Sequence, residues 1–160
     1  MNEIIYRPIG VIHTPFSEAK DMPIQPAGAQ GTDGWIELFP EFALGLKDVD
    51  GFSHLVLLYH FHMSEGYSLE VVPFMDDTLR GVFATRAPKR PNPIGLSVVR
   101  LVKIQENRLY VKDLDIVDGT PLLDIKPFVA EIDNRETTAS GWLSEKAMKF
   151  RTKRSDDRFD

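Results

Sequence analysis

Short apolar runs separated by prolines and glycines dominate the sequence, and few stretches show the spacing of an amphipathic helix. Residues 53–63, SHLVLLYHFHM, are almost continuously apolar or aromatic, which is typical of a strand in a barrel wall or of one buried on both faces. Residues 96–104 and 109–117 are two further expected strands, and the QEN connection between them predicts a hairpin. Shorter runs predict the other strands at residues 3–13, 35–39, 69–74, 81–85 and 122–129.

Helical signals are confined to two segments. Pro40 stands where a helix favours its first residue, so residues 40–49 are expected to form a short helix. From Ser140 onward apolar residues recur at helical spacing, and cations gather late, where the C-terminus of a helix favours them. Residues 16–34 hold few apolar side chains and predict a long loop. Many strands and few helices indicate a mainly β fold, an antiparallel sheet curled into a barrel.

The length and composition narrow the class further. A chain of 160 residues suits one domain with a core, and we expect a β-barrel domain at residues 1–138 followed by a short basic helix and tail at residues 139–160. Cysteine is absent, which excludes disulfides, thiolate nucleophiles and cysteine-ligated metals. The sequence shows no signal peptide and no apolar run of membrane-spanning length, so we expect a cytoplasmic protein with no membrane contact.

Charge is distributed unevenly along the chain. The net charge of -5 argues against a protein that coats nucleic acid with its whole surface. Residues 80–90 nevertheless hold four cations and no acid, and residues 146–154 hold five cations and no acid. One such run is usually a solvated face, but two on an acidic chain indicate local anion binding. The expected RNA-contacting cations are Lys89, Arg90, Lys149, Arg151, Lys153 and Arg154.

The segment RAPKRPNPIGLS, residues 86–97, is a basic loop stiffened by three prolines. Each proline fixes its own φ and disfavours helix at the residue before it, so the segment is expected to be rigid and extended. Ser97 lies in no GxSxG motif and is expected to hydrogen-bond the loop backbone. His60 and His62 share one strand face without an evident third ligand, so we expect no metal. Glycine-rich Rossmann and P-loop motifs are also absent from the sequence.

Asp115, Asp118 and Asp124 cluster around a predicted turn, and two interpretations remain open. Aspartates often hydrogen-bond their own backbone in turns. They also accept hydrogen bonds from ligands, and a carboxyl with a raised pKa can act as a base. Because this acidic turn and the basic proline loop both adjoin buried strands, we expect them to form a site at a barrel mouth for a ligand of mixed charge.

These segments resemble the TsaA-like, or VirR-like, family, whose characterised members are called TrmO. RAPKRPNPIGLS with the preceding GVFAT, and LDIVDGTPLLDIKPF, are similar to its two signature segments, and IGVIHTPF, MPIQPAG and DGFSHLVLLYHFH are similar to further ones, so the match covers about residues 4–129. The resemblance implies a β-barrel methyltransferase, unrelated to the Rossmann type, that uses S-adenosyl-L-methionine. It also implies a homodimer with the methyl donor near the subunit interface, and N6-methylation of threonylcarbamoyl-adenosine beside the tRNA anticodon.

The resemblance extends to individual site residues. The implied donor-binding residues are Pro23, Ile24, Gln25, His62, Met63, Arg86, Leu96, Lys112, Asp113, Leu114 and Asp115. Arg86 would meet the carboxylate of the donor, and Asp115 or Asp118 is the candidate catalytic base or orienting group. Characterised bacterial members continue into a further C-terminal domain, whereas a short basic helix is expected after this barrel. The alternative function is a non-catalytic nucleoside- or RNA-binding barrel module.

Overall fold

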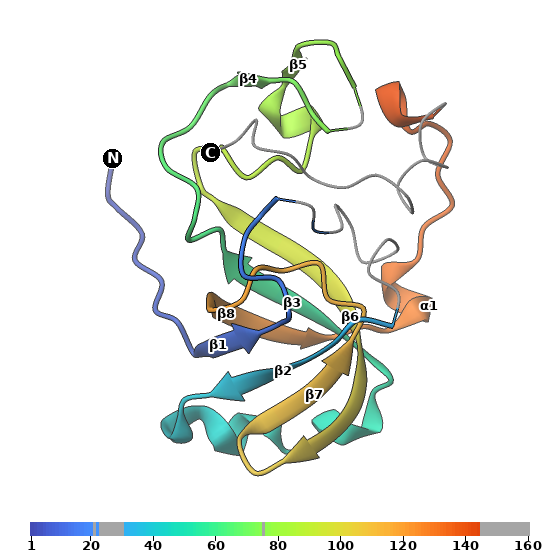
Figure 1. Cartoon of the computed structure of the whole chain (residues 1–160). Coiled ribbons are helices and arrows are strands. Elements are labelled where there is room, and N and C mark those ends of the chain that lie inside the picture. Colours follow the sequence, from blue (N-terminus) through green and yellow to red (C-terminus); the bar gives the residue numbers. More distant parts are fainter. Residues whose placement is uncertain (21, 23–30, 75, 145–160) are drawn as a thin grey trace.

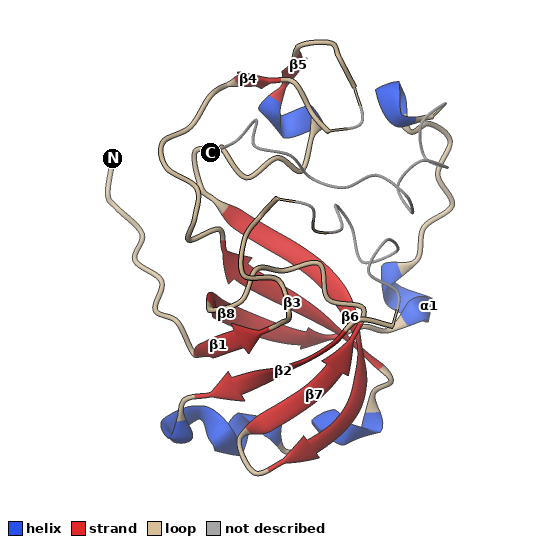
Figure 2. Ribbon diagram, in the orientation of Figure 1, coloured by secondary structure: helices blue, strands red, loops and turns tan. Residues whose placement is uncertain are grey.

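Six antiparallel strands form a closed barrel in the computed structural model, which describes residues 1–20, 22, 31–74 and 76–144 (Figures 1 and 2). The order around the barrel is β1-β2-β7-β6-β3-β8, and β8 pairs with β1 to complete it. The prediction of a mainly β fold built on an antiparallel barrel is confirmed. The strands are β1 (Gly10–His13), β2 (Asp33–Leu38), β3 (His54–His60), β6 (Ile94–Gln105), β7 (Arg108–Lys112) and β8 (Thr120–Pro127).

Alternating side chains on each strand fill the barrel. In β3, Leu55, Leu57 and Tyr59 are buried while the residues between them face outward, as the pleat of a strand requires. Equivalent inward positions on the other strands supply Ile12, Ile36, Val99, Leu109, Val111 and Leu122 to the same core. Full burial of one such aliphatic side chain contributes about 1.5–3 kcal/mol, so this shared core is the main stabilising feature of the barrel.

A small lobe lies beyond the end of the barrel where β3 ends and β6 begins (Figure 1). It consists of a two-stranded sheet, β4 (Glu70–Val71) and β5 (Arg80–Gly81), followed by a 3-10 turn, η4 (Val82–Ala84). Val71, Val82 and Ala87 form a second, separate apolar cluster, against which Phe74 packs. The lobe therefore has its own core and stands over one mouth of the barrel.

Helical structure in the described residues is short. The helix expected at residues 40–49 is a 3-10 helix, η2 (Pro40–Leu46), followed by the turn η3 (Val49–Gly51), and its proline does stand at the first position. The only α-helix of the described chain is α1 (Ala130–Asp133). From Ser140 the described residues form one 3-10 turn, η5 (Gly141–Leu143), and residues 145–160 of the expected basic helix lie outside the described residues.

Two predicted strands are shorter than expected because their pairing ends. The strand expected at residues 3–13 begins only at Gly10, since Gly10 pairs with Leu38, the last residue of β2. Residues 1–8 are accordingly exposed. The segment expected at residues 69–74 pairs only at β4.

Two further strand predictions were wrong: one segment is mostly not a strand, and the other strand ends earlier than expected. Residues 81–85 pair only at Gly81 and then form η4. The strand expected at residues 109–117 ends at Lys112, because Asp113 adopts a positive φ of 70° that no strand continues. Residues 114–116 are buried after this bend, so the chain turns into the barrel mouth.

The QEN connection forms the hairpin between β6 and β7, as predicted. Gln105 pairs with Arg108, which leaves Glu106 and Asn107 as a two-residue turn, with Glu106 at a φ of 54°. The Asn107 side-chain amide donates to the Leu38 carbonyl oxygen at 2.6 Å, so the turn is also fastened to the end of β2.

Candidate active site

Four segments meet at the barrel mouth below the β4–β5 lobe. They are the end of β3, the proline loop, the start of β6 and the loop between β7 and β8 (Figure 1). The Phe61 N–H donates to the Pro93 carbonyl oxygen at 2.8 Å, which fixes the proline loop beside the end of β3. Ser97, at the end of the proline segment, also hydrogen-bonds Asp115, so the mouth places the proline segment beside the start of the acidic turn.

The centre of the mouth is a chain of three buried polar side chains, Tyr59, Ser97 and Asp115. Ser97 Oγ donates to Asp115 Oδ1 at 2.6 Å, and Tyr59 Oη lies 3.0 Å from Ser97 Oγ. Ser97 is 1% exposed and Asp115 is 8% exposed, so water contributes little to their solvation. A short hydrogen bond to a buried carboxylate is of the stronger, charge-assisted kind.

Burial controls the proton affinity of this chain. Loss of solvation raises the pKa of Asp115 to about 7, although the hydrogen bond from Ser97 and the positive charge of Arg86 oppose the shift. Burial also raises the pKa of Tyr59 well above its usual value, and the nearby Asp115 carboxylate raises it further. Asp115 therefore exchanges its proton near neutral pH, which is the property of an efficient general acid or base.

Ser97 and Tyr59 were not expected in the site. Ser97 was predicted to hydrogen-bond the loop backbone, but its hydroxyl contacts the side chains of Tyr59 and Asp115 instead. The available signal was the two-residue alternation of β6, which places Ser97 on the same inward face as Val99. A polar residue on a core-facing position requires a polar partner, and the sequence did not identify that partner.

The predicted donor stretch from Lys112 to Asp115 contains four side chains in different settings. Lys112 Nζ lies 3.1 Å from Asp33 Oδ1, and Asp113 Oδ1 accepts a 2.6 Å hydrogen bond from the Gly31 N–H. Leu114 is fully buried in the core. Only Asp115 turns a polar side chain into the mouth, while Leu114 has only its backbone available to a ligand.

The other two aspartates of the predicted cluster lie in turns or at the surface. Asp118 Oδ1 accepts the Thr14 N–H at 3.0 Å and lies 3.5 Å from His13 Nδ1. Asp124 accepts the N–H of the next residue and lies 2.7 Å from Lys126 Nζ. Turn chemistry therefore describes Asp118, whereas Asp115 has the buried environment of a ligand-binding or catalytic group.

The remaining predicted donor residues lie on both sides of the barrel wall. His62 Nδ1 lies 3.3 Å from Thr120 Oγ1 at the mouth. Burial lowers the pKa of His62, and electrostatic interaction with the neighbouring His60 lowers it further. Met63 and Leu96 are 57% and 47% exposed. Leu96 follows the outward face of β6, opposite to Ser97, so it does not share the interior with Asp115. Pro23, Ile24 and Gln25 lie outside the described residues.

The predicted RNA-contacting cations are only partly described. Arg90 Nη1 donates to the carbonyl oxygens of Thr85 and Ala87 at 3.1 and 3.4 Å, so its guanidinium helps to hold the proline loop. Lys89 is half-buried beside it. The other four, Lys149, Arg151, Lys153 and Arg154, lie outside the described residues.

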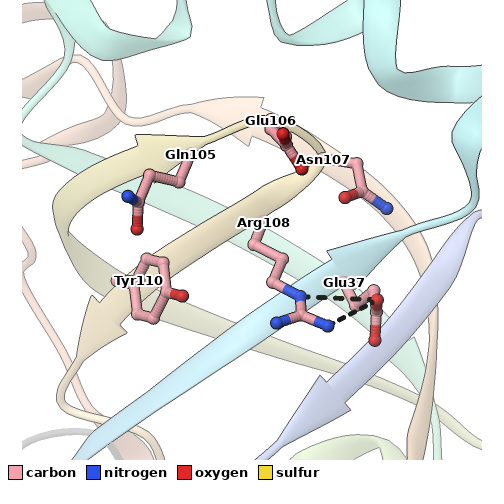
Figure 3. Close-up of a pocket in the computed structure, with 6 residues that line it drawn as sticks. All are labelled: Glu37, Gln105, Glu106, Asn107, Arg108 and Tyr110. Carbon is pink, nitrogen blue, oxygen red and sulfur yellow. Dashed lines mark hydrogen bonds and ion pairs between the residues drawn. The ribbon is translucent and has the colours of Figure 1, made fainter.

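A surface depression of about 580 Å³ lies at the opposite end of the barrel, around the β6–β7 hairpin (Figure 3). Its lining is polar, and Arg108 crosses it to contact Glu37 Oε1 at 3.1 Å. We place the candidate site at the other mouth because this depression lacks the buried carboxyl and the apolar walls of a cofactor pocket. Within the described residues, no three His, Asp or Glu side chains are grouped to hold a metal ion. None of the described helices is long and apolar enough to cross a membrane.

Comparison with known proteins defines the class of this barrel. A Pyrococcus abyssi protein named "Probable S-adenosyl-L-methionine-binding protein" is 56% identical over 98% of this chain and 85% of its own length. An Archaeoglobus fulgidus protein named "S-adenosyl-L-methionine-binding protein" is 42% identical over 81% of this chain and 93% of its own length. The chain thus belongs with β-barrel proteins that are named for binding S-adenosyl-L-methionine.

The particular family follows from three further matches. The model of the tRNA-methyltransferase O N-terminal domain matches residues 11–134. The crystal structure of TrmO from Pseudomonas aeruginosa superposes with a TM-score of 0.73 and 38% identity over 89% of this chain, and this chain covers 63% of that one. Human tRNA (adenine(37)-N6)-methyltransferase is 32% identical over 82% of this chain and 31% of its own length. The chain belongs to the TrmO family of S-adenosyl-L-methionine-dependent methyltransferases, and it spans just under two thirds of the solved TrmO chain.

The residues at the mouth fit this cofactor chemically. Arg86 is an exposed cation of the kind that binds a carboxylate, Met63 is exposed apolar surface beside the mouth, and Leu96 is exposed apolar surface on the outer face of β6. Asp115 supplies a carboxyl, and the Thr120 hydroxyl and His62 supply hydrogen-bonding groups nearby. These chemical groups are of the kinds that a ligand with an adenine, hydroxyls and a charged amino-acid end requires.

Proposed function

We propose that this chain methylates N6 of threonylcarbamoyl-adenosine beside the anticodon of tRNA. The observation that carries the proposal is the buried Asp115 carboxyl, whose pKa is raised to about 7 and which experiences the positive charge of Arg86. Membership of the TrmO family supports the reaction type, and the name of the human relative supports position 37 of tRNA as the target. A cytoplasmic location agrees with a tRNA substrate.

The acceptor nitrogen explains why a base is needed. Its lone pair is delocalised into the carbamoyl group, so it is a poor nucleophile while it retains its proton. S-adenosyl-L-methionine, when bound, supplies a methyl group already activated by a positively charged sulfur. Asp115 would accept the N6 proton as the nitrogen gains the methyl group, and the cofactor would supply that methyl group with a sulfur leaving group able to keep the bonding electron pair. The site residues otherwise act by alignment and by exclusion of water.

The proposal assigns the donor to residues around the mouth. Arg86 binds its carboxylate, while Met63 and Leu96 face its apolar parts and His62 hydrogen-bonds it. The other members of the proposed donor site are Pro23, Ile24, Gln25, Lys112, Asp113 and Leu114, the last through its backbone. Lys89 and Arg90, with the tail cations Lys149, Arg151, Lys153 and Arg154, are proposed to meet tRNA phosphates.

Asp115 is preferred over Asp118 as the base. Asp118 is exposed and its Oδ1 is occupied by the Thr14 N–H, so it is proposed to hold the turn beside the site. Asp115 combines burial with a carboxyl that changes protonation near neutral pH. That combination suits proton transfer from a weakly acidic N–H.

We further propose that two copies form a homodimer through the outer face of β3 and β6. On this face Ile94 and Leu96 are 39% and 47% exposed, beside the half-buried Val56, Leu58 and Val98. A contiguous apolar strip on a barrel exterior is typical of a subunit contact. Sedimentation equilibrium tests this: a monomer mass that stays constant up to high concentration would exclude it.

The function is tested with purified protein, undermethylated tRNA and S-adenosyl-L-methionine carrying a labelled methyl group. Nucleoside mass spectrometry is expected to find the label on threonylcarbamoyl-adenosine, at a rate that falls by about 10²–10⁴ in Asp115→Asn. Label on a different nucleoside would reject the substrate. Donor binding by calorimetry without any labelled nucleoside would favour the binding-module alternative.

A further inference from the structure

Strand β6 places two unusual residues on the interior of the barrel. Gly95 and Ser97 both lie on its buried face, in the positions that bulky aliphatic residues occupy elsewhere in the core. Gly95 pairs with Tyr59 of β3, and a Cβ atom at Gly95 would overlap the Tyr59 ring. The absence of a side chain at Gly95 therefore creates the space in which the Tyr59 ring lies.

The position of that ring determines what Ser97 can do. With the ring over Gly95, Tyr59 Oη is 3.0 Å from Ser97 Oγ, and Ser97 Oγ is 2.6 Å from Asp115 Oδ1. A serine hydroxyl has one hydrogen and two lone pairs. When Asp115 is ionised, Ser97 donates its hydrogen to the carboxylate and accepts the hydrogen of Tyr59. The three groups then form one directional chain, from Tyr59 through Ser97 to Asp115.

Tyr59 is well suited to be the fixed donor of this chain. Its burial raises its pKa well above the usual value, so the phenol keeps its proton at every pH at which Asp115 titrates. The positive charge of Arg86 also acts on the Asp115 carboxyl and lowers its pKa. Arg86 is exposed and Tyr59 is buried, so the Asp115 carboxyl experiences an exposed cation while Ser97 and Tyr59 hold it from the core.

We infer that Ser97 and Tyr59 are positioning residues for Asp115, which hold its carboxylate in one orientation and favour its ionised form, and that Gly95 admits the Tyr59 ring. The inference rests on the proposed role of Asp115 as base. The inference assigns a function to the end of the proline segment. The prolines fix the loop, while Gly95 and Ser97 fix the orientation of the Asp115 carboxylate, the proposed proton acceptor.

A measurement on the free chain tests the inference without methyl transfer. The ¹³C carboxyl shift of Asp115 is followed by NMR against pH in the whole chain, with Asp115→Asn used for assignment. Ser97→Ala is expected to raise the midpoint by about one pH unit or more, because it removes a hydrogen bond to the charged form. Tyr59→Phe, which keeps Ser97, is expected to raise the Asp115 midpoint by less. Ser97→Thr, which keeps a hydroxyl, is expected to give the wild-type midpoint.

Two control variants match these changes at the surface. Ser53→Ala removes a hydroxyl that contacts His54 Nδ1, and Tyr110→Phe removes a phenol on the outer face of β7. Both are expected to leave the Asp115 midpoint unchanged. Tyr59→Phe alone decides the outcome if Ser97→Ala does not fold. An unchanged midpoint in the folded Tyr59→Phe and Ser97→Ala variants would overturn the inference.

Single-turnover methyl transfer against pH separates this inference from the proposed function. The acidic limb of the rate profile is expected to lie at the highest pH in Ser97→Ala, at a lower pH in Tyr59→Phe and at the lowest pH in the wild type. An active enzyme whose acidic limb stays in place in both variants would overturn the positioning role and leave the function standing. A shifted NMR midpoint in a chain without methyl transfer would support the positioning role and reject the function.

Discussion

The Asp118 carboxylate accepts a 3.0 Å hydrogen bond from the Thr14 N–H, and the two residues are 104 positions apart in the sequence. A second bond, from the Asp118 N–H to the Phe16 carbonyl oxygen at 2.7 Å, runs beside the first. The chain that follows β1 is thereby fastened to the turn that precedes β8. Asp118 thus connects two segments of the mouth from outside the buried chain of polar groups.

Replacing Asp118 is therefore expected to lower stability. Asp118→Ala removes the acceptor of the Thr14 N–H, and urea unfolding should show a loss of about 1–2 kcal/mol. Asp118→Asn retains an acceptor oxygen and should lose less. Methyl transfer by folded Asp118→Ala protein should remain within about tenfold of wild type. Unchanged stability with abolished transfer would instead make Asp118 the catalytic carboxylate.

The raised pKa of Asp115 gives a pH dependence of stability with a definite sign. In the folded chain its pKa rises from the ordinary 3.8 to about 7, so between these values the native state keeps a proton that the unfolded chain has released. Stability therefore falls as pH rises through this window, and the full cost is present above pH 7. The cost is on the order of 4 kcal/mol, since each tenfold change in proton affinity is about 1.4 kcal/mol.

Asp115→Asn removes this titration and keeps a similar shape. The difference in unfolding free energy between Asp115→Asn and wild type, measured in urea, should increase in favour of the variant from pH 4 to pH 8. Other titrating groups cancel in the difference, because both proteins contain them. A difference that stays constant across this range would show that Asp115 remains ionised throughout.

A methyl group at Gly95 should be costly, because its Cβ would overlap the Tyr59 ring. Gly95→Ala is expected to destabilise the fold by about 1–3 kcal/mol, as overpacking of a core does. Gly81→Ala is the matched control, since nothing lies within 4 Å of its added Cβ. In a double-mutant cycle, Gly95→Ala should cost less in a Tyr59→Leu background than alone. Additive costs would show that the two positions do not compete for space.

Arg90 should affect stability as well as any binding of RNA. Its guanidinium donates to two carbonyl oxygens of the proline loop, so Arg90→Ala is expected to lower the free energy of unfolding by about 1–2 kcal/mol. Lys89→Ala is the neighbouring control and should mainly reduce the salt dependence of tRNA binding, measured by filter retention. Unchanged stability in Arg90→Ala would show that these two hydrogen bonds do not stabilise the fold.

The sequence was sufficient to predict elements whose pattern is local. The apolar run at residues 53–63 contains β3, and the QEN connection forms the β6–β7 hairpin, because side-chain alternation and turn chemistry act over a few residues. The strand expected from residue 3 failed for a non-local reason. Ile4 and Ile5 suit a strand, but β2 ends opposite Gly10 and leaves them without a partner. Strand length here depends on the partner strand.

The candidate site shows the same limit. Asp115 and Arg86 were predicted as site residues from their loops, but the partners of Asp115 come from β3 and β6. Tyr59 meets Ser97 only because the register of these strands sets Tyr59 opposite Gly95. A change of register by one residue would turn Tyr59 to the outer face. Composition and motif spacing contain no information about that register.

Closure of the barrel through β8 has a consequence for biosynthesis. Strand β8, which ends at Pro127, pairs with both β1 and β3, so no shorter nascent chain can complete the ring. Until the ribosome releases this segment, β1 and β3 each carry an unpaired edge, the feature that promotes aggregation between chains. The barrel therefore depends on its last strand during synthesis, and a truncation within β8 should give insoluble protein.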